Sequence, residues 1–289
     1  DIVSGIFATG LASSPDTKLL IDIGTNGEVV IGNSDFLICA SASAGPAFEG
    51  SECSGGMRAA SGAIDHIKLL DADHVLSYST IASAPPVGIC GTGYVDLIAE
   101  MLRTRVIDKT GRIQPGASAT RVRESAGGEM EYLVASGERT GTGKDVGITQ
   151  SDVNNILRAK GAIYAAIAVL LDALDMTLDD ITEIMIAGAF GNFLNVENAV
   201  FIGLLPDVPS DRLRFVGNAS LAGAKLAALS DGCYERVFEV AAKTTYFELS
   251  TTPTFMDQFV SACFFPHTDL ELFPSVMAEL AREEEEIAK

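Results

Sequence analysis

The stretch Leu19-Leu20-Ile21-Asp22-Ile23-Gly24-Thr25-Asn26-Gly27-Glu28 decides the fold, because an apolar strand runs directly into a glycine-bearing turn. A second strand of this kind ends in Ile184-Met185-Ile186-Ala187-Gly188-Ala189-Phe190-Gly191. Glycines let backbone N–H groups crowd around an anion, and a neighbouring carboxylate can hold hydrated Mg²⁺. Together the two stretches indicate phosphate binding without a Walker lysine. For the first stretch alone, the alternative is an ordinary hairpin with Asn26-Gly27 at its tip.

The order of the strands predicts a mixed α/β sheet of five strands flanked by helices. Lys18–Ile23, Glu28–Gly32 and Phe36–Ser41 are joined by loops too short for crossovers, so they should be adjacent and antiparallel. Glu183–Ala187 and Arg212–Val216 should extend the same sheet, parallel to the first strand. The two glycine stretches would then meet at one edge of the sheet, where α/β proteins gather ligands.

Helices are predicted from capping residues and from glycine turns. Thr149 and Asp152 form a capping-box pattern that opens a long helix reaching about Asp175. Gly217-Asn218-Ala219 follows a strand and leads into a helix, which places backbone donors where an anion binds well. A shorter helix is expected over Met57–Ile64.

Composition excludes several classes of function. The net charge of −19 argues against nucleic acid and against anionic membrane surfaces as partners. The longest apolar stretch, Ala162–Leu171, is too short to cross a bilayer. The cysteines contain no C-x-x-C pair and are typical of reduced thiols in a cytoplasmic protein rather than of an iron–sulfur site. They are Cys39, Cys53, Cys90, Cys233 and Cys263.

We expect residues 1–289 to form one lobe. Residues 109–146 are polar and glycine-rich and are interpreted as an insertion, and residues 274–289 as an acidic terminal helix. Residue 1 is Asp rather than Met, so the chain is expected to be part of a longer polypeptide.

Seven motifs in order carry a resemblance to a known family. The sequence is similar to the C-terminal ATPase domain of the reductive activators of corrinoid proteins, over about Leu19–Pro266. These activators belong to the ASKHA superfamily of acetate and sugar kinases, heat-shock-70 proteins and actin. The motifs are Leu20–Glu28, Ala44–Gly50, Gly56–Ala60, Gly88–Gly93, Ile148–Asp152, Ala187–Phe193 and Val216–Ala219.

The resemblance implies a ribonuclease-H-like lobe that binds ATP and Mg²⁺. It also implies a function, in which ATP drives a low-potential electron into the Co(II) state of a partner corrinoid protein. In this family a [2Fe–2S] cluster sits in a ferredoxin domain, which this chain does not contain. A homodimer is compatible with the resemblance.

The resemblance also assigns roles to residues. Asp22 would hold Mg²⁺ through water, and Glu28 would orient water, so both are candidate catalytic residues. The turn of the first strand would contact phosphates, and the later glycine turns would contact the rest of the nucleotide. The candidate nucleotide-binding residues are Gly24, Thr25, Asn26, Gly27, Gly188, Ala189, Phe190, Gly191, Gly217 and Asn218.

Two other functions stay open at this point. One is a small-molecule kinase of the same superfamily, and the other is a non-catalytic module that docks on a corrinoid protein. Only one Asp-x-Gly-Thr turn occurs in the chain, so the corresponding turn of the first lobe is expected upstream of Asp1. The isolated chain is therefore expected to bind ATP weakly and to hydrolyse it negligibly.

Overall fold

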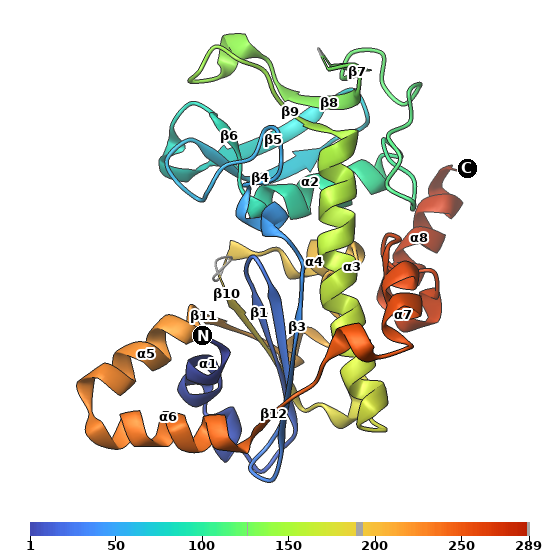
Figure 1. Cartoon of the computed structure of the whole chain (residues 1–289). Helices are drawn as coiled ribbons and strands as arrows, with labels where there is room; N and C mark the ends of the chain where they lie inside the picture. The colour runs from blue at the N-terminus through green and yellow to red at the C-terminus, as the bar shows by residue number, and fades with distance from the viewer. Residues whose placement is uncertain (126, 189–192, 288–289) are drawn as a thin grey trace. The chain divides into compact units, whose positions relative to one another are not determined.

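The computed structural model describes residues 1–125, 127–188 and 193–287. The chain divides into two compact units (Figure 1). Unit 1 consists of Asp1–Ser43, Ala162–Phe193 and Val208–Phe259. Unit 2 consists of Ala44–Gly161, Leu194–Asp207 and Val260–Lys289.

Unit 1 is built on a six-stranded mixed sheet in the order β11-β10-β1-β2-β3-β12. The strands β1, β2 and β3 form an antiparallel meander, while β10 pairs in parallel with β1 and β11 in parallel with β10. These pairings confirm the predicted arrangement. The strands are β1 (Lys18–Ile23), β2 (Gly27–Gly32), β3 (Leu37–Ala42), β10 (Glu183–Gly188), β11 (Leu213–Gly217) and β12 (Thr244–Tyr246).

Two details of the predicted sheet were wrong. The sheet has a sixth strand, β12, which pairs in parallel with β3 over three residues and is too short to leave an alternating pattern. The tip of the first hairpin is not Asn26-Gly27, because Gly27 already pairs with Ile23 inside the ladder. Position 27 requires glycine because of packing rather than because of a turn: a Cβ there would lie 2.5 Å from Cγ1 of Ile163.

The two faces of this sheet are covered by different helices (Figure 1). Ile163 belongs to the long helix α3 (Gln150–Ala173), so the face that carries Gly27 packs on α3. Leu20, Val30 and Met185 point to the opposite face, in one core cluster with residues of the other helices of unit 1. Those helices are α1 (Ile2–Thr9), α5 (Ala219–Leu229) and α6 (Asp231–Lys243).

Unit 2 contains two three-stranded sheets, β5-β4-β6 and β7-β8-β9. The predicted helix over Met57–Ile64 was wrong: Met57 N donates to the carbonyl of Ile89, and β4 begins at Ala63, so strand pairing overrides the local pattern. The strands are β4 (Ala63–Leu69), β5 (Val75–Thr80), β6 (Gly88–Ile89), β7 (Val122–Glu124), β8 (Met130–Ala135) and β9 (Val146–Thr149). The helices are α2 (Gly91–Arg103), α4 (Val196–Phe201), α8 (Pro274–Ile287) and parts of α3 and α7 (Phe255–Ala262).

Helix α3 begins with the predicted capping box, since Thr149 N donates to Asp152 and Asp152 N donates to Thr149 Oγ1. Further along α3, Lys160 is fully buried and its Nζ donates to the carbonyl oxygens of Phe264 and Pro266. Burial lowers the pKa of Lys160 to about 7. Within the described part of the chain, no helix is long and apolar enough to cross a membrane.

The buried lysine predicts a pH-dependent stability. The folded pKa of Lys160 is about 7 against an ordinary value of 10.5, so between these pH values the unfolded chain binds more protons. The free energy of unfolding should therefore rise with pH in that window, by at most about 1.4 kcal/mol per pH unit. Urea unfolding at several pH values, compared between the wild type and Lys160→Met, measures this slope. Equal slopes in both proteins would contradict the assignment.

Candidate functional site

The ends of three parallel strands meet in unit 1. Ile23 at the end of β1 pairs with Gly188 at the end of β10, and Ala187 pairs with Gly217 at the end of β11. The pairing of β10 with β11 shifts in register just before this point, which adds a local irregularity to the edge. The structure therefore brings together the first glycine turn and the start of the second, as the sequence predicted, and places the Gly217-Asn218 turn beside them.

Gly188 is the tightest point of this edge. Its φ is +113°, and a Cβ at this position would overlap the carbonyl oxygen of Ile23. Only glycine fits both conditions without strain. The predicted residues Ala189, Phe190 and Gly191 lie outside the described residues.

The turn between β1 and β2 consists of Gly24, Thr25 and Asn26. It is closed by a hydrogen bond in which Gly24 N donates to the carbonyl of Asn26 over 3.0 Å. Thr25 and Asn26 are exposed, while Gly27 is buried against α3. The exposed members of the predicted phosphate turn are thus Thr25 and Asn26, with Gly24 half-buried, and Gly27 acts as a packing residue.

Two carboxylates face each other beside this turn. Asp22 and Glu28 are register partners on neighbouring antiparallel strands, so their side chains leave the same face of the sheet. Burial raises the pKa of Asp22, although a hydrogen bond from Ser220 opposes this rise. Burial also raises the pKa of Glu28, and the charge of Asp22 raises it further. None of the ion pairs found among the described residues includes either carboxylate.

Helix α5 reaches this carboxylate pair with its first turn. Ser220 Oγ donates to Asp22 Oδ2 over 3.0 Å. Asn218 is the N-cap, and its side-chain oxygen accepts from Leu221 N over 2.8 Å. One backbone donor of the helix start is therefore already occupied by Asn218, while Asn218 itself remains exposed beside the strand ends.

This donor set fits a hydrated magnesium ion better than a caged metal. No group of three or more His, Cys, Asp or Glu side chains in the described ranges could hold a metal by itself. Mg²⁺ is commonly bound by one or two carboxylates together with water and the phosphates of a substrate. A cation here would also relieve the repulsion between Asp22 and Glu28 that raises the pKa of Glu28.

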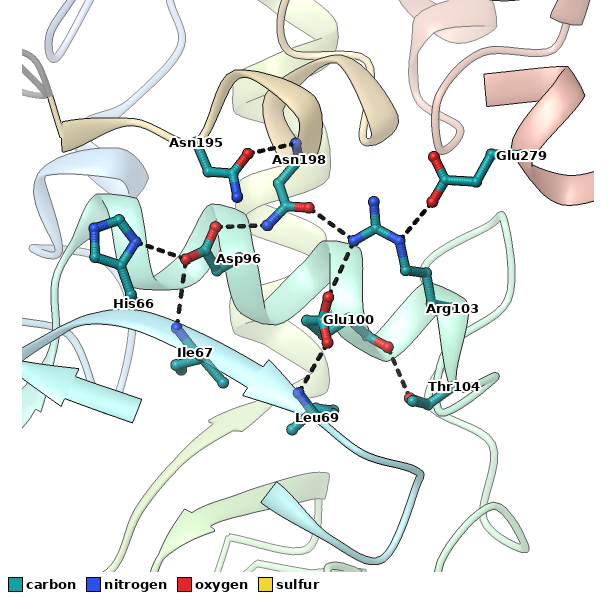
Figure 2. A network of polar contacts seen from close by, with 10 residues as sticks. All are labelled: His66, Ile67, Leu69, Asp96, Glu100, Arg103, Thr104, Asn195, Asn198 and Glu279. Carbon is teal, nitrogen blue, oxygen red and sulfur yellow. Dashed lines mark hydrogen bonds and ion pairs between the residues drawn. The ribbon is translucent and has the colours of Figure 1, made fainter. Parts of the chain in front are cut away.

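A second polar centre lies within unit 2, and the sequence did not reveal it (Figure 2). Asp96 accepts from Asn198 Nδ2 over 2.6 Å and lies 2.9 Å from His66 Nδ1. Arg103 donates to Asn198, to Glu100 and, over 2.8 Å, to Glu279. The network lines a cavity of about 930 Å³.

The members of this network satisfy one another. The buried carboxylate of Glu100 also accepts from Leu69 N over 2.8 Å, so the network joins β4, α2, α4 and α8. Asp96, Glu100 and Arg103 are spaced by four and three residues on α2, which places them on one face. That spacing within an otherwise apolar helix is the signal that would have indicated the network. The mutual pairing of these side chains gives the network a structural role, because buried polar groups need hydrogen-bond partners.

The architecture and the glycine-lined edge beside Asp22 and Glu28 define an ASKHA domain, the class to which acetate and sugar kinases, heat-shock-70 proteins and actin belong. A family model described as the C-terminal domain of RACo, the ASKHA domain, matches residues 16–277. The chain belongs to this family.

Similar proteins have related names. The chain is 36% identical over 262 residues to "Corrinoid activation enzyme RamQ" of Eubacterium limosum, covering 89% of this chain and 44% of that protein. It is 28% identical to "[Co(II) methylated amine-specific corrinoid protein] reductase" of Methanosarcina barkeri, covering 88% and 47%. A solved structure, "Reductive activator for corrinoid,iron-sulfur protein", is 48% identical with a TM-score of 0.91, covering 95% and 44%. The chain thus spans about half the length of these relatives.

Because the backbone at Gly188 lies so close to the Ile23 carbonyl, adding one methyl group there is expected to destabilise the fold strongly. Gly188→Ala should lower the free energy of unfolding by about 3 kcal/mol or more, because strain at positive φ adds to overlap with the Ile23 carbonyl. Gly10→Ala is the matched control, since Gly10 has φ +72° and open space around its Cβ. The control should cost only about 1 kcal/mol. Chemical denaturation of both variants tests the difference, and equal losses would contradict it.

The carboxylate pair predicts a conflict between stability and binding. Glu28→Gln removes a charge that is disfavoured by burial and by Asp22, so the free energy of unfolding at neutral pH should rise slightly, solvent screening of the half-buried group keeping the gain small. The same change should weaken the response to Mg²⁺ with ATP. Thermal unfolding with and without Mg-ATP measures both effects, and a destabilised variant would contradict the electrostatic argument.

Proposed function

We propose that this chain is the nucleotide-binding part of an ATP-dependent reductive activator, which drives low-potential electron transfer to the Co(II) state of a corrinoid protein. The observation that carries the proposal is the Asp22–Glu28 pair at the meeting point of the glycine turns. The names of the relatives supply the reaction: they are described as corrinoid activation or reductase proteins.

Each residue of the site has a role in this proposal. Asp22 would hold Mg²⁺ through water, and Glu28 would share that charge and orient water. The exposed Thr25 and Asn26 would offer a hydroxyl, an amide and backbone donors to phosphate oxygens. Mg²⁺, when bound, neutralises the charge of the phosphates.

The hydrogen bond between Ser220 and Asp22 suggests how the site communicates with the rest of unit 1. A cation near Asp22 competes for the carboxylate oxygen that accepts from Ser220 Oγ. The nucleotide-bound and nucleotide-free states would then differ in how firmly the first turn of α5 is held. A ligand shifts a conformational equilibrium only through such a difference in contacts.

The electron is proposed to come from an iron–sulfur group outside this chain. The cysteines here are free thiols, and no group of three or more His, Cys, Asp or Glu side chains among the described residues could hold a metal. Burial raises the pKa of Cys53 to about 12, which makes that thiol a poor ligand or nucleophile. The free thiols also support a cytoplasmic location.

The proposal predicts that Asp22→Ala abolishes ATP-dependent activation by the full-length activator while the fold remains intact. The carboxylate is half-buried at a strand end, and its loss removes the proposed Mg²⁺ contact without opening the core. Cobalt reduction in the corrinoid protein, followed by absorbance with Mg-ATP and a low-potential reductant, measures activation. Thermal unfolding with millimolar Mg-ATP measures nucleotide binding in the same variant.

Asp35→Ala is the matched control. Asp35 is an exposed aspartate in the turn between β2 and β3, at the end of β2 opposite to the Asp22–Glu28 pair. The Asp35→Ala variant should show the same activation and the same thermal response to Mg-ATP as the wild type. An Asp22→Ala protein that still activates the corrinoid protein would remove Asp22 from the mechanism.

A further inference from the structure

One side chain that contacts Asp22 was not singled out by the sequence. Ser220 lies half-buried in the first turn of α5, and its Oγ donates to Asp22 Oδ2 over 3.0 Å. This hydrogen bond restricts rotation of the carboxylate and leaves Oδ1 for other partners. The two carboxylate oxygens together offer about four lone-pair sites, so a hydrated cation can share Asp22 with Ser220.

The hydroxyl of Ser220 is held from two sides. On its own helix, the N-cap Asn218 accepts from Leu221 N over 2.8 Å, which fixes the first turn of α5. On the other side lies Gly5 of α1, where an added Cβ would lie 3.6 Å from Ser220 Oγ and 3.7 Å from Cβ of Ala219. These are ordinary contact distances, so the backbone of α1 leaves room for only one methyl group beside the hydroxyl.

Helix α1 lies this close to Ser220 because α5 has a glycine three residues further on. A Cβ at Gly223 would overlap the carbonyl oxygen of Ser4, so a larger residue there would push the two helices apart. Helix α1 also places Ile6 in the same core cluster as Leu20, which comes two residues before Asp22 on β1. Helix α1 therefore packs on both elements that carry the hydrogen bond, the start of α5 and the strand of Asp22.

We propose that Ser220 is a positioning residue of the nucleotide site, and that α1 holds its hydroxyl in place through Gly5. The inference rests on the proposed function, because it concerns the carboxylate that would hold hydrated Mg²⁺. Ser220 touches neither the metal nor the nucleotide in this role and acts only through Asp22.

The proposal gives helix α1 a role in the site. Helix α1 precedes the region that the family model matches, residues 16–277. Outer partners that orient a metal-binding group commonly change metal affinity by about 10–100-fold when they are removed. A change in α1 that displaces Ser220 should therefore have an effect of the same size as the loss of the hydroxyl itself.

Two pairs of substitutions separate this role from general packing. Gly5→Ala adds a methyl group at ordinary contact distance, whereas the branched side chain of Gly5→Val must displace Ser220 Oγ. Ser220→Ala removes the hydroxyl, and Ser220→Thr keeps it. The first member of the Gly5 pair and the second member of the Ser220 pair are thus the matched controls.

The first measurement needs no ligand. The carbon-13 NMR signal of the Asp22 carboxyl group, assigned by its absence in Asp22→Asn, reports the hydrogen bond at an alkaline pH where the carboxyl group is ionised. The signal should shift in the same direction in Gly5→Val and Ser220→Ala. It should stay at its wild-type position in Gly5→Ala and Ser220→Thr.

The second measurement is calorimetric titration of the full-length activator with Mg-ATP. Affinity should fall by about tenfold or more in Ser220→Ala and in Gly5→Val. The double variant should bind no more weakly than Ser220→Ala alone, because both changes remove the same contact. Gly5→Ala and Ser220→Thr should bind like the wild type.

The proposed function and the positioning role fail in different ways. A wild-type protein that binds no Mg-ATP contradicts the proposed function, while the carboxyl signal still decides whether α1 holds Ser220. An unshifted signal in Gly5→Val, wild-type affinity in Ser220→Ala, or losses that add in the double variant would overturn the positioning role. If Gly5→Val does not fold, Gly223→Ala disturbs the same contact between the helices, and the same outcomes apply.

Discussion

The parallel pairing of β1 with β10 is the constraint on which the candidate site depends. It sets Ile23 against Gly188, and this contact is possible only because Gly188 lacks a Cβ that would overlap the Ile23 carbonyl. The pairing of β10 with β11 then places Gly217 beside the same edge. Parallel strands present their carboxyl ends together, so turns from three distant parts of the chain converge without any loop having to reach across the sheet.

The register of the β1–β2 ladder has an electrostatic consequence. Pairing Ile23 with Gly27 also pairs Asp22 with Glu28, so the sheet cannot form without bringing two carboxylates together in a half-buried position. Burial and mutual repulsion raise the pKa of Glu28, which means that the folded chain carries this arrangement at a cost. Local arrangements that oppose stability are expected where a ligand supplies the missing charge, and a hydrated cation is the simplest such ligand.

The central sheet of unit 1 could be predicted from the sequence because the features that specify it lie close together in the chain. Short loops impose antiparallel neighbours, and the two glycine stretches mark strand ends, so the meeting of Asp22 with Gly188 could be predicted from the pattern alone. The pattern could not show why position 27 needs glycine. The reason is the contact with Ile163, which joins residues far apart in the chain. The network around Asp96 and Arg103 was missed for the same reason, because its partners Asn198 and Glu279 lie about 100 and 180 residues further along the chain.

Helix α5 links the carboxylate pair to the surface of unit 1. Its first turn holds Asp22 through Ser220, and its last turn carries Leu229 at the exposed surface. Gly223 lets α5 lie directly against the Ser4 backbone of α1, so the two helices are closely packed. A change in the charge balance at Asp22 would therefore act on the first turn of a helix that packs closely on α1. Through the Ser220–Asp22 hydrogen bond, the charge state of the carboxylate pair can affect a helix whose large side chains face solvent at the surface of unit 1.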